Sequence, residues 1–450
     1  MQFLTLAMFC AVTAGEFLVR LQVLNRYLTF LPELFSAVFV VYAVIAGVQQ
    51  RFRLVKPQYW LVFGLMLVVI VCGVVANSVE TGPLVAGIRA YFKAIPLFFL
   101  PAVLAMQDRR IRQQLLLLLG IALVQIPIAI AQRWIVMKEH RFTGDPVSGT
   151  LLISSILSIF LICAVCVLTG LYLRKRISKL VYYALVVLLL IPTTINETKG
   201  TLILLPLGLL VTFLVGSPRG KRTQIVVGVA MFVALFGAVF APIYDYMNRN
   251  KPYAIPITEF MTRQDKLEGY LDRGAEVGTT EPVGRVDAIV VPLQQLAKDP
   301  VQLVFGYGIG NASRSALGEQ FTGKYAVRFG PFAITSASTF LLEIGLLGTG
   351  LVLLLYWMIF RDALAVARLD DGVRGALAIG WTGVTVIVAL ATAYKTTYTF
   401  ESLSYLFWYF SGMIAARRMQ FALAPSPSGS KLRETSRRSR PRGTVVAGVR

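Results

Sequence analysis

The chain has 450 residues, of which 56% are hydrophobic and only 15% are charged. About a quarter of the residues of a soluble globular protein are charged, so this composition excludes an ordinary soluble enzyme and favours a membrane protein. The formal net charge of +21 would suit a nucleic-acid-binding protein, but the basic residues are sorted into alternate connections between apolar runs, which excludes nucleic acid as the partner.

Twelve apolar runs follow one another along the chain, separated by charged or polar connections. A helix needs roughly 20 apolar residues to cross a hydrocarbon core of about 30 Å, and most of the runs approach that length. The first run has no basic residues before it, and we interpret it as a retained span rather than a signal peptide. The fold class is therefore all-α polytopic membrane protein. The predicted spans are 2–19, 31–49, 58–76, 87–106, 113–131, 149–173, 180–196, 200–216, 224–243, 335–360, 376–394 and 399–416.

Every second connection between these runs is basic, and basic residues accumulate in cytoplasmic connections. The basic set holds more than half of the 44 Lys and Arg residues but few of the 23 acidic residues. We therefore expect both termini to be cytoplasmic. The basic set comprises the connections around 51–56, 109–112, 174–179, 219–222 and 361–374 together with the C-terminal tail.

Four parts follow from this topology: a bundle of nine spans over 1–243, a large extracytoplasmic loop over 244–334, three spans over 335–418, and a basic tail over 419–450. In the loop, apolar residues recur at helical spacing over 285–298, and 244–247 and 255–261 have the mixed composition of surface-lying helices. We expect a helical cap over the outer mouth. The Pro/Ser/Arg-rich tail is predicted to be disordered and attracted to anionic headgroups of the lipid bilayer.

Other motifs give little chemistry. The four cysteines, Cys10, Cys72, Cys163 and Cys166, all lie in apolar runs, so neither disulfides nor a zinc site are expected. Cys163 and Cys166 form a CxxC pair that we interpret as packed thiols, because a redox pair needs an accessible thiolate. No His or carboxylate cluster has metal-ligand spacing, and neither a metal nor another cofactor is expected. The stretch Gly306-Tyr-Gly-Ile-Gly310 lacks the GxGxxG nucleotide fingerprint, and we interpret it as a tight turn.

Cations in the outward connections are the strongest functional candidates, because the positive-inside bias should remove them. Lys199 lies beside Glu197 in a short connection between two apolar runs. A charge so close to the apolar slab indicates function; the alternative is a Lys that pairs with Glu197 or reaches the headgroups. Arg89 and Lys93 are four residues apart and share a helix face. With Arg141 they could form a cationic ring, for which a phosphate is the natural ligand.

Four short stretches occur in an order that can be compared with known families. Arg141-Phe-Thr-Gly144 precedes a span, and Asn196-Glu-Thr-Lys-Gly-Thr201 opens a Leu-rich span. Gly284-Arg285 precedes a helix and then Pro300-Val-Gln-Leu-Val-Phe-Gly-Tyr-Gly-Ile-Gly310, and Phe340-Leu-Leu-Glu-Ile-Gly-Leu-Leu-Gly348 begins the span after the loop. This pattern resembles the O-antigen ligase and polysaccharide polymerase superfamily of bacterial inner-membrane glycosyltransferases, over roughly residues 85–360.

The chain departs from that family in two respects. Lys199 stands where the family usually has Arg, and Ala337 and Ser338 stand where its ligases carry His-Asn. The missing histidine favours a polymerase over a ligase. The resemblance implies a GT-C-like bundle that transfers a sugar chain from a polyprenyl pyrophosphate carrier to an acceptor hydroxyl. Other polysaccharide assembly proteins are possible partners.

The resemblance also implies roles for particular residues. Lys199, Arg285 and Arg141 are expected to stabilise the departing pyrophosphate without a metal. Arg89, Lys93 and Arg328 are further candidates for pyrophosphate binding, and Glu197, Asp287 and Asp145 for a general base. Two other functions stay open: a ligase that joins finished chains to an acceptor, and a flippase of lipid-linked sugars. A flippase needs a polar path, whereas the predicted spans are mostly uncharged at their centres.

Overall fold

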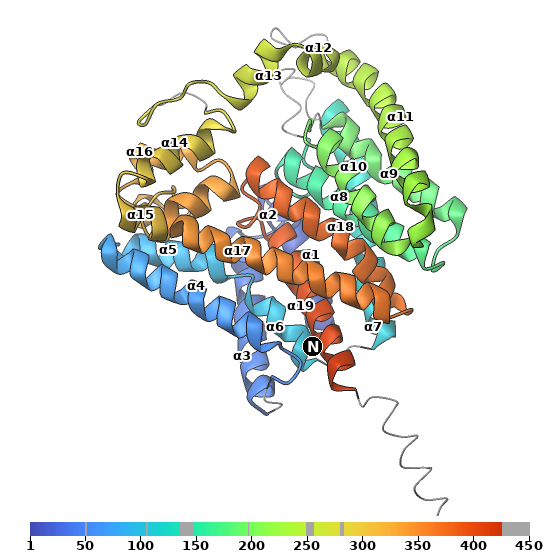
Figure 1. Ribbon diagram of the computed structural model, residues 1–450, viewed down its shortest axis with the longest axis horizontal. Helices are drawn as coiled ribbons and strands as arrows, with labels where there is room; N and C mark the ends of the chain where they lie inside the picture. The colour runs from blue at the N-terminus through green and yellow to red at the C-terminus, as the bar shows by residue number, and fades with distance from the viewer. Residues whose placement is uncertain are drawn as a thin grey trace, which may run out of the picture.

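The computed structural model describes residues 1–49, 52–104, 107–135, 147–196, 198–248, 256–279 and 283–424. Over these ranges the regular structure is helical (Figure 1). The helices of the first half are α1 (Gln2–Cys10), α2 (Glu16–Arg20), α3 (Leu31–Gln49), α4 (Pro57–Ala76), α5 (Thr81–Phe92), α6 (Pro96–Val103), α7 (Asp108–Trp134), α8 (Ser154–Leu173), α9 (Lys179–Ile195) and α10 (Thr201–Gly216). The second half contains α11 (Arg222–Asn248), α12 (Ile257–Thr262), α13 (Gln264–Leu271), α14 (Asp287–Leu296), α15 (Pro300–Phe305), α16 (Ala326–Phe329), α17 (Ser336–Leu369), α18 (Val373–Tyr394) and α19 (Glu401–Leu423).

The composition and length of these helices make the chain a helical membrane protein. In the part of the chain that the structure describes, eight helical segments are long and apolar enough to cross a membrane, or nine if the bent pair α5–α6 forms one span. The other predicted spans coincide with α9 and α10, which have 17 and 16 residues, and with α19, which has 23. The total of twelve crossings stays a prediction.

The observed helices depart from the predicted segments in several places. The span expected over 87–106 is broken, because α5 and α6 meet at an angle of 41°. The helix of the span expected over 149–173 begins only at Ser154, after Gly149 and Leu152 adopt positive φ angles. Residues 244–247, expected to form a surface-lying helix, are instead the last turn of α11, which continues through Pro242. Alone, the periodicity of a short mixed segment does not separate a surface helix from the extension of a span.

The centre of the bundle is α18, which packs against α8, α10 and α17. Glycines let the helix backbones approach closely, as is common between membrane helices. A Cβ on Gly170 of α8 would lie 2.7 Å from the backbone nitrogen of Gly380 of α18. By contrast, α11 lies at the edge of the bundle (Figure 1) and is mostly exposed. Hydropathy does not separate the centre from the rim, since the most apolar windows of α8 and α11 have mean hydropathies of 2.6 and 2.5.

Ion pairs join the basic connections to one another at one end of the bundle. Arg174 pairs with Asp371 at 2.6 Å, and Arg417 pairs with Asp370 at 2.7 Å. The same end holds two further pairs. These are Lys56–Asp362 and Arg374–Asp108. Contacts among the expected outward connections, such as that of the Lys324 ammonium with the Asn77 carbonyl at 2.9 Å, lie apart from them. This grouping is what alternate crossings require; which end faces the cytoplasm stays a prediction.

The loop is anchored to the bundle at a break in α17. Gly345 has φ 64° and ψ −168° in the middle of that helix, and its backbone faces the backbone of Gly306, so closely that a Cβ on Gly345 would lie 2.5 Å from the Gly306 nitrogen. The Tyr307 N–H donates to the Leu342 carbonyl at 2.6 Å. The Asn77 side chain of the α4–α5 connection donates to the Gly306 carbonyl at 3.0 Å.

The turn predicted at 306–310 is confirmed, because Gly306, Gly308 and Gly310 all have positive φ. The buried carboxylate of Glu343, two residues before the break in α17, accepts hydrogen bonds from the backbone and side chain of Ser313, at 3.1 and 2.6 Å. Loop residues 306–313 are thus fixed against α4, α5 and α17. The helix expected over 285–298 is observed as α14, on the same side of the bundle.

Candidate functional site

The site begins with the connection between α9 and α10, which carries Lys199. The Asn196 amide donates to the Ser154 carbonyl at 2.9 Å and to the Ser158 hydroxyl at 2.8 Å, and its carbonyl oxygen accepts the Thr198 N–H at 3.2 Å. These bonds fix the connection to the first turn of α8. The turn is therefore held on a rigid helix end, which keeps the position of Lys199 defined.

Lys199 itself is half-buried, and its ammonium nitrogen lies 6.0 Å from the ring centre of Tyr244 in α11. A cation at this distance from an aromatic face is attracted by the ring quadrupole. The last turn of α11, absent from the predicted span, thus forms one wall of the site. Both the Lys199 turn and Tyr244 lie where the bundle meets the large loop.

Arg285 comes to the same place from the loop. Its guanidinium carbon lies 5.7 Å from the ring centre of Tyr394, the last residue of α18. The Tyr394 ring also packs against the Lys199 turn, since a Cβ on Gly200 would lie 2.9 Å from the Tyr394 Cζ. One aromatic ring thus links the loop cation to the turn that carries the membrane-edge cation.

Two buried hydroxyls flank Lys199. Thr198 is 6% exposed and Thr201 is 0% exposed, and the hydroxyl oxygen of each makes no hydrogen bond to the described residues. Burying a hydroxyl without a partner costs about 1–3 kcal/mol. Such groups call for a partner, which a bound phosphate oxygen, a sugar hydroxyl or a water would supply. The α9–α10 turn therefore holds one cation, Lys199, with a buried hydroxyl within two residues on each side of it.

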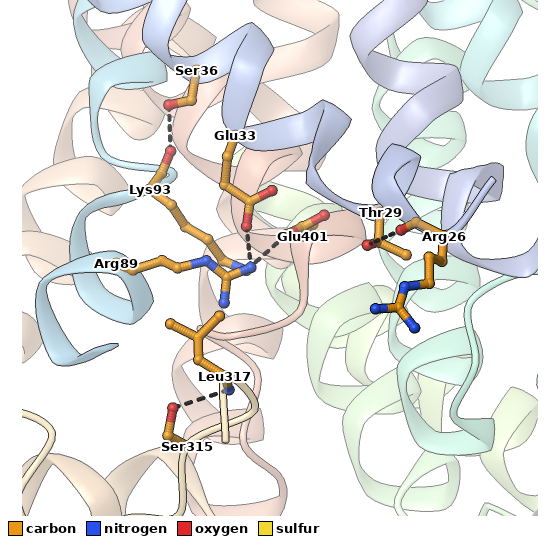
Figure 2. Close-up of polar contacts among 9 residues, drawn as sticks. All are labelled: Arg26, Thr29, Glu33, Ser36, Arg89, Lys93, Ser315, Leu317 and Glu401. Atoms are coloured by element: carbon orange, nitrogen blue, oxygen red, sulfur yellow. Dashed lines mark hydrogen bonds and ion pairs between the residues drawn. The ribbon is translucent and has the colours of Figure 1, made fainter. Parts of the chain in front are cut away.

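Arg89 and Lys93 form a different arrangement from the one expected. Figure 2 shows both side chains turned toward carboxylates: Arg89 pairs with Glu33 of α3, and the Lys93 ammonium lies 2.8 Å from the carboxylate of Glu401 of α19. The Ser36 hydroxyl donates to the Lys93 carbonyl and ties α3 to the end of α5. Two cations and two carboxylates make this cluster formally neutral. A pyrophosphate would have to displace Glu33 or Glu401 to bind there.

Asp287 and Arg328 serve the loop's own structure. The buried Asp287 carboxylate accepts the Arg273 N–H at 2.7 Å. The Arg328 side chain is exposed, with its guanidinium carbon 5.2 Å from the ring centre of Phe329 and one nitrogen 3.5 Å from the Gln295 side-chain oxygen. These contacts do not test the expected roles in proton abstraction and pyrophosphate binding.

Several predicted residues lie outside the described residues. They are Arg141, Glu197 and Asp145. The structure therefore tests neither the cationic ring with Arg141 nor the Lys199–Glu197 pair.

Sequence reasoning missed the partners of the cations. Tyr394 carried no charge and no motif, and nothing in the sequence could have found it. Glu33, Glu343 and Glu401 did carry a signal, because each is a carboxylate at or within an apolar run, where an ionisable residue is costly and needs a partner. All three accept hydrogen bonds or ion pairs from distant segments.

No protein-family model matches the chain, and no curated protein matches it either. A functional assignment rests on the geometry of this site and on the short motifs that it contains.

Proposed function

We propose that the protein is a membrane glycosyltransferase that polymerises polyprenyl-pyrophosphate-linked oligosaccharides on the extracytoplasmic face of the bacterial inner membrane, in a twelve-span topology with both termini cytoplasmic. The observation that carries the proposal is the meeting of Arg285 and the Lys199 turn at the Tyr394 ring. Two of the four stretches that carry the superfamily resemblance, far apart in the sequence, thus lie at one place.

The chemistry asks for cations at that place. An acceptor hydroxyl oxygen attacks the anomeric carbon of the donor sugar, the bond from that carbon to the pyrophosphate oxygen breaks, and the hydroxyl proton passes to a base. Charge develops on the departing pyrophosphate, and preplaced cations stabilise it most in a site that excludes water. The Arg285 guanidinium can bind two phosphate oxygens at once, while Lys199 acts as a point charge.

The surroundings of the two cations support the same assignment. The unpartnered hydroxyls of Thr198 and Thr201 suit phosphate or sugar oxygens, which accept and donate hydrogen bonds. The anchored loop would cover the site and limit hydrolysis of the donor. Glu197, Asp287 and Asp145 remain the candidates for the base. Arg89 and Lys93, already neutralised by carboxylates, take a structural role in this proposal rather than a place at the pyrophosphate.

The test is a deletion strain carrying Arg285→Ala, Lys199→Ala or wild-type protein, with carrier-linked intermediates extracted and identified by mass spectrometry. We expect both variants to accumulate single repeat units on the outer face at normal protein levels. The matched control is Arg263→Ala. Arg263 is an exposed loop arginine paired with Asp265 and Glu259, so its removal should leave polymer unchanged.

Other outcomes overturn the proposal. Long polymer that stays on the carrier indicates a ligase, and repeat units trapped on the cytoplasmic face indicate a flippase. Polymer of wild-type length in both variants removes these residues from the chemistry altogether.

A further inference from the structure

A second site has its mouth at the end of the bundle away from the loop. A cavity of about 580 Å³ opens between α7, α8, α9, α18 and α19, within the roughly 300–1,000 Å³ of typical small-molecule sites. Its wall is apolar, with Leu119, Leu185 and Phe407 among its residues. Leu116 and Val181 also line it and are exposed at the protein surface. The groove is therefore open toward the space that lipid chains occupy.

The groove is long enough for a lipid chain. On α18 it is lined from Val373 to Val388, and fifteen helical steps of about 1.5 Å give roughly 22 Å. One leaflet contributes about half of a hydrocarbon core of roughly 30 Å. A chain that enters at the Val373 end can lie in the groove along its whole depth in that leaflet.

The Val373 end carries three cations, Arg112, Lys175 and Arg176, which line the same cavity. All three are exposed, and none forms an ion pair with a carboxylate among the described residues. Arg176 donates to the backbone carbonyl of Asp371 at 2.8 Å, while the Asp371 carboxylate pairs with Arg174. The nearby acidic residue is thus already neutralised, and the mouth of the groove keeps its positive charge.

Lys175 stands in an unusual backbone conformation. Its φ is 54°, and its N–H and that of Arg176 close the C-terminus of α8 by bonding to the Tyr172 and Leu171 carbonyls, each at 2.8 Å. Glycine is the usual residue at this left-handed position. Lys175 is therefore under a backbone strain that a glycine would relieve. Strained residues are often functional, which supports a binding role for the Lys175 side chain.

We infer that this groove binds one anionic phospholipid from the leaflet beside the basic connections. Its phosphate lies among Arg112, Lys175 and Arg176, and one of its hydrocarbon chains lies along the apolar wall. Charge complementarity selects the occupant, since a neutral lipid would fill the same apolar space without using the cations. The three cations at the mouth lie at the end of the bundle away from Lys199 and Arg285, so headgroup binding does not rest on the proposed glycosyl transfer.

The test is native mass spectrometry of the full-length protein in detergent, titrated with phosphatidylglycerol or phosphatidylcholine of identical chains. Each basic residue near a headgroup contributes about fivefold in affinity. We expect one phosphatidylglycerol to bind about a hundredfold more tightly than phosphatidylcholine, and the triple variant Arg112→Gln/Lys175→Gln/Arg176→Gln to lose this preference. The matched control, Arg53→Gln/Arg109→Gln/Arg368→Gln, removes three exposed cations that do not line the groove and should keep it.

Two single variants separate binding from folding. Lys175→Gly should weaken phosphatidylglycerol binding about fivefold without lowering the Tm, because glycine relieves the strained φ. Ala164→Phe places a ring in the apolar wall and should weaken binding of either lipid. Equal binding of the two lipids by wild-type protein, or a preference that survives the triple variant, overturns the inference. Two results together would indicate only an anion site and would also overturn the inference. These are displacement of phosphatidylglycerol by inorganic phosphate and unchanged phosphatidylglycerol binding by Ala164→Phe.

Discussion

The guanidinium of Arg285 lies over the ring of Tyr394, 5.7 Å from its centre, and the same ring packs against Gly200. A tyrosine at the end of α18 thereby fixes a loop residue beside the α9–α10 turn. The ring can orient Arg285 through the attraction between a cation and an aromatic face, which contributes about 0.5–2 kcal/mol. This relationship gives the proposed site its shape and can be tested directly.

Removal of the Arg285 charge should lower polymer formation strongly. Removal of the Tyr394 ring beneath Arg285 should lower polymer formation less. Loss of one group that stabilises developing charge costs about 10²–10³ in rate, so Arg285→Ala should fall in that range. Arg285→Lys should recover little, because an ammonium does not reproduce the bidentate guanidinium. The measurement is polymer formed per unit of membrane-inserted protein.

At Tyr394, a Phe substitution keeps the ring and a Leu substitution removes it. We expect Tyr394→Phe to retain most of the activity and Tyr394→Leu to lose about tenfold, the equivalent of roughly 1.4 kcal/mol. Equal activities for the two variants would mean that the ring does not position Arg285.

Removal of the Thr198 or Thr201 hydroxyl should affect activity and stability differently. Both are buried without a hydrogen-bond partner, so Thr201→Val removes an unsatisfied group and should leave the Tm unchanged or higher. If the hydroxyl binds a phosphate oxygen, the same substitution should lower polymer formation about tenfold or more, since hydrogen bonds to charged groups contribute about 1.5–3 kcal/mol.

Thr193 is the matched control for that prediction. It is equally buried, but its hydroxyl donates to the Leu190 carbonyl at 2.7 Å. Thr193→Val should therefore leave polymer formation unchanged and lower stability slightly. A Thr201→Val protein that is both less stable and fully active would contradict a ligand-binding role.

The sequence could predict the helices and the ends of the bundle that they share, but not the partners of the cations. Apolar runs and basic connections are local features, and they predicted the two helices, α9 and α10, that flank Lys199. The ion pairs Arg89–Glu33 and Lys93–Glu401 join residues 56 and 308 positions apart. Tyr394 belongs to no motif, and its role depends on the contact between the start of α10 and the end of α18.

Helix breaks were missed for a related reason. The run that contains α5 and α6 was interpreted as one span from its hydropathy alone. Pro96, the first residue of α6, is a helix-breaking residue at the 41° bend, and it was the signal that this interpretation overlooked. The bend places Arg89 and Lys93 beside α3 and α19, where the carboxylates lie. There Glu33 and Glu401 neutralise the two cations.

The Lys93–Glu401 pair should behave as a structural element. The two side chains are 10% and 21% exposed, and removal of one partner of a buried pair destabilises a protein by about 3–5 kcal/mol. Lys93→Met alone should lower the Tm in detergent, and Lys93→Met/Glu401→Leu should recover most of the loss, because no uncompensated charge remains. The double variant should also make polymer. A stable but inactive double variant would restore Lys93 to the pyrophosphate site.

The break in α17 at Gly345 should tolerate no side chain. Its φ of 64° with ψ of −168° belongs to a region that is essentially restricted to glycine, and a Cβ there would lie 2.3 Å from the Val304 carbonyl oxygen. Both strain and clash oppose Gly345→Ala, so we expect loss of the loop anchor, measured as faster proteolysis within 283–335 and a lower Tm.

Gly350→Ala is the control, five residues further along the same helix, where nothing lies within 4 Å of an added Cβ. It should raise stability by about 0.5–1 kcal/mol, because alanine is the better helix former. Similar stability for the two variants would mean that the contact between Gly306 and Gly345 does not hold the loop on the bundle.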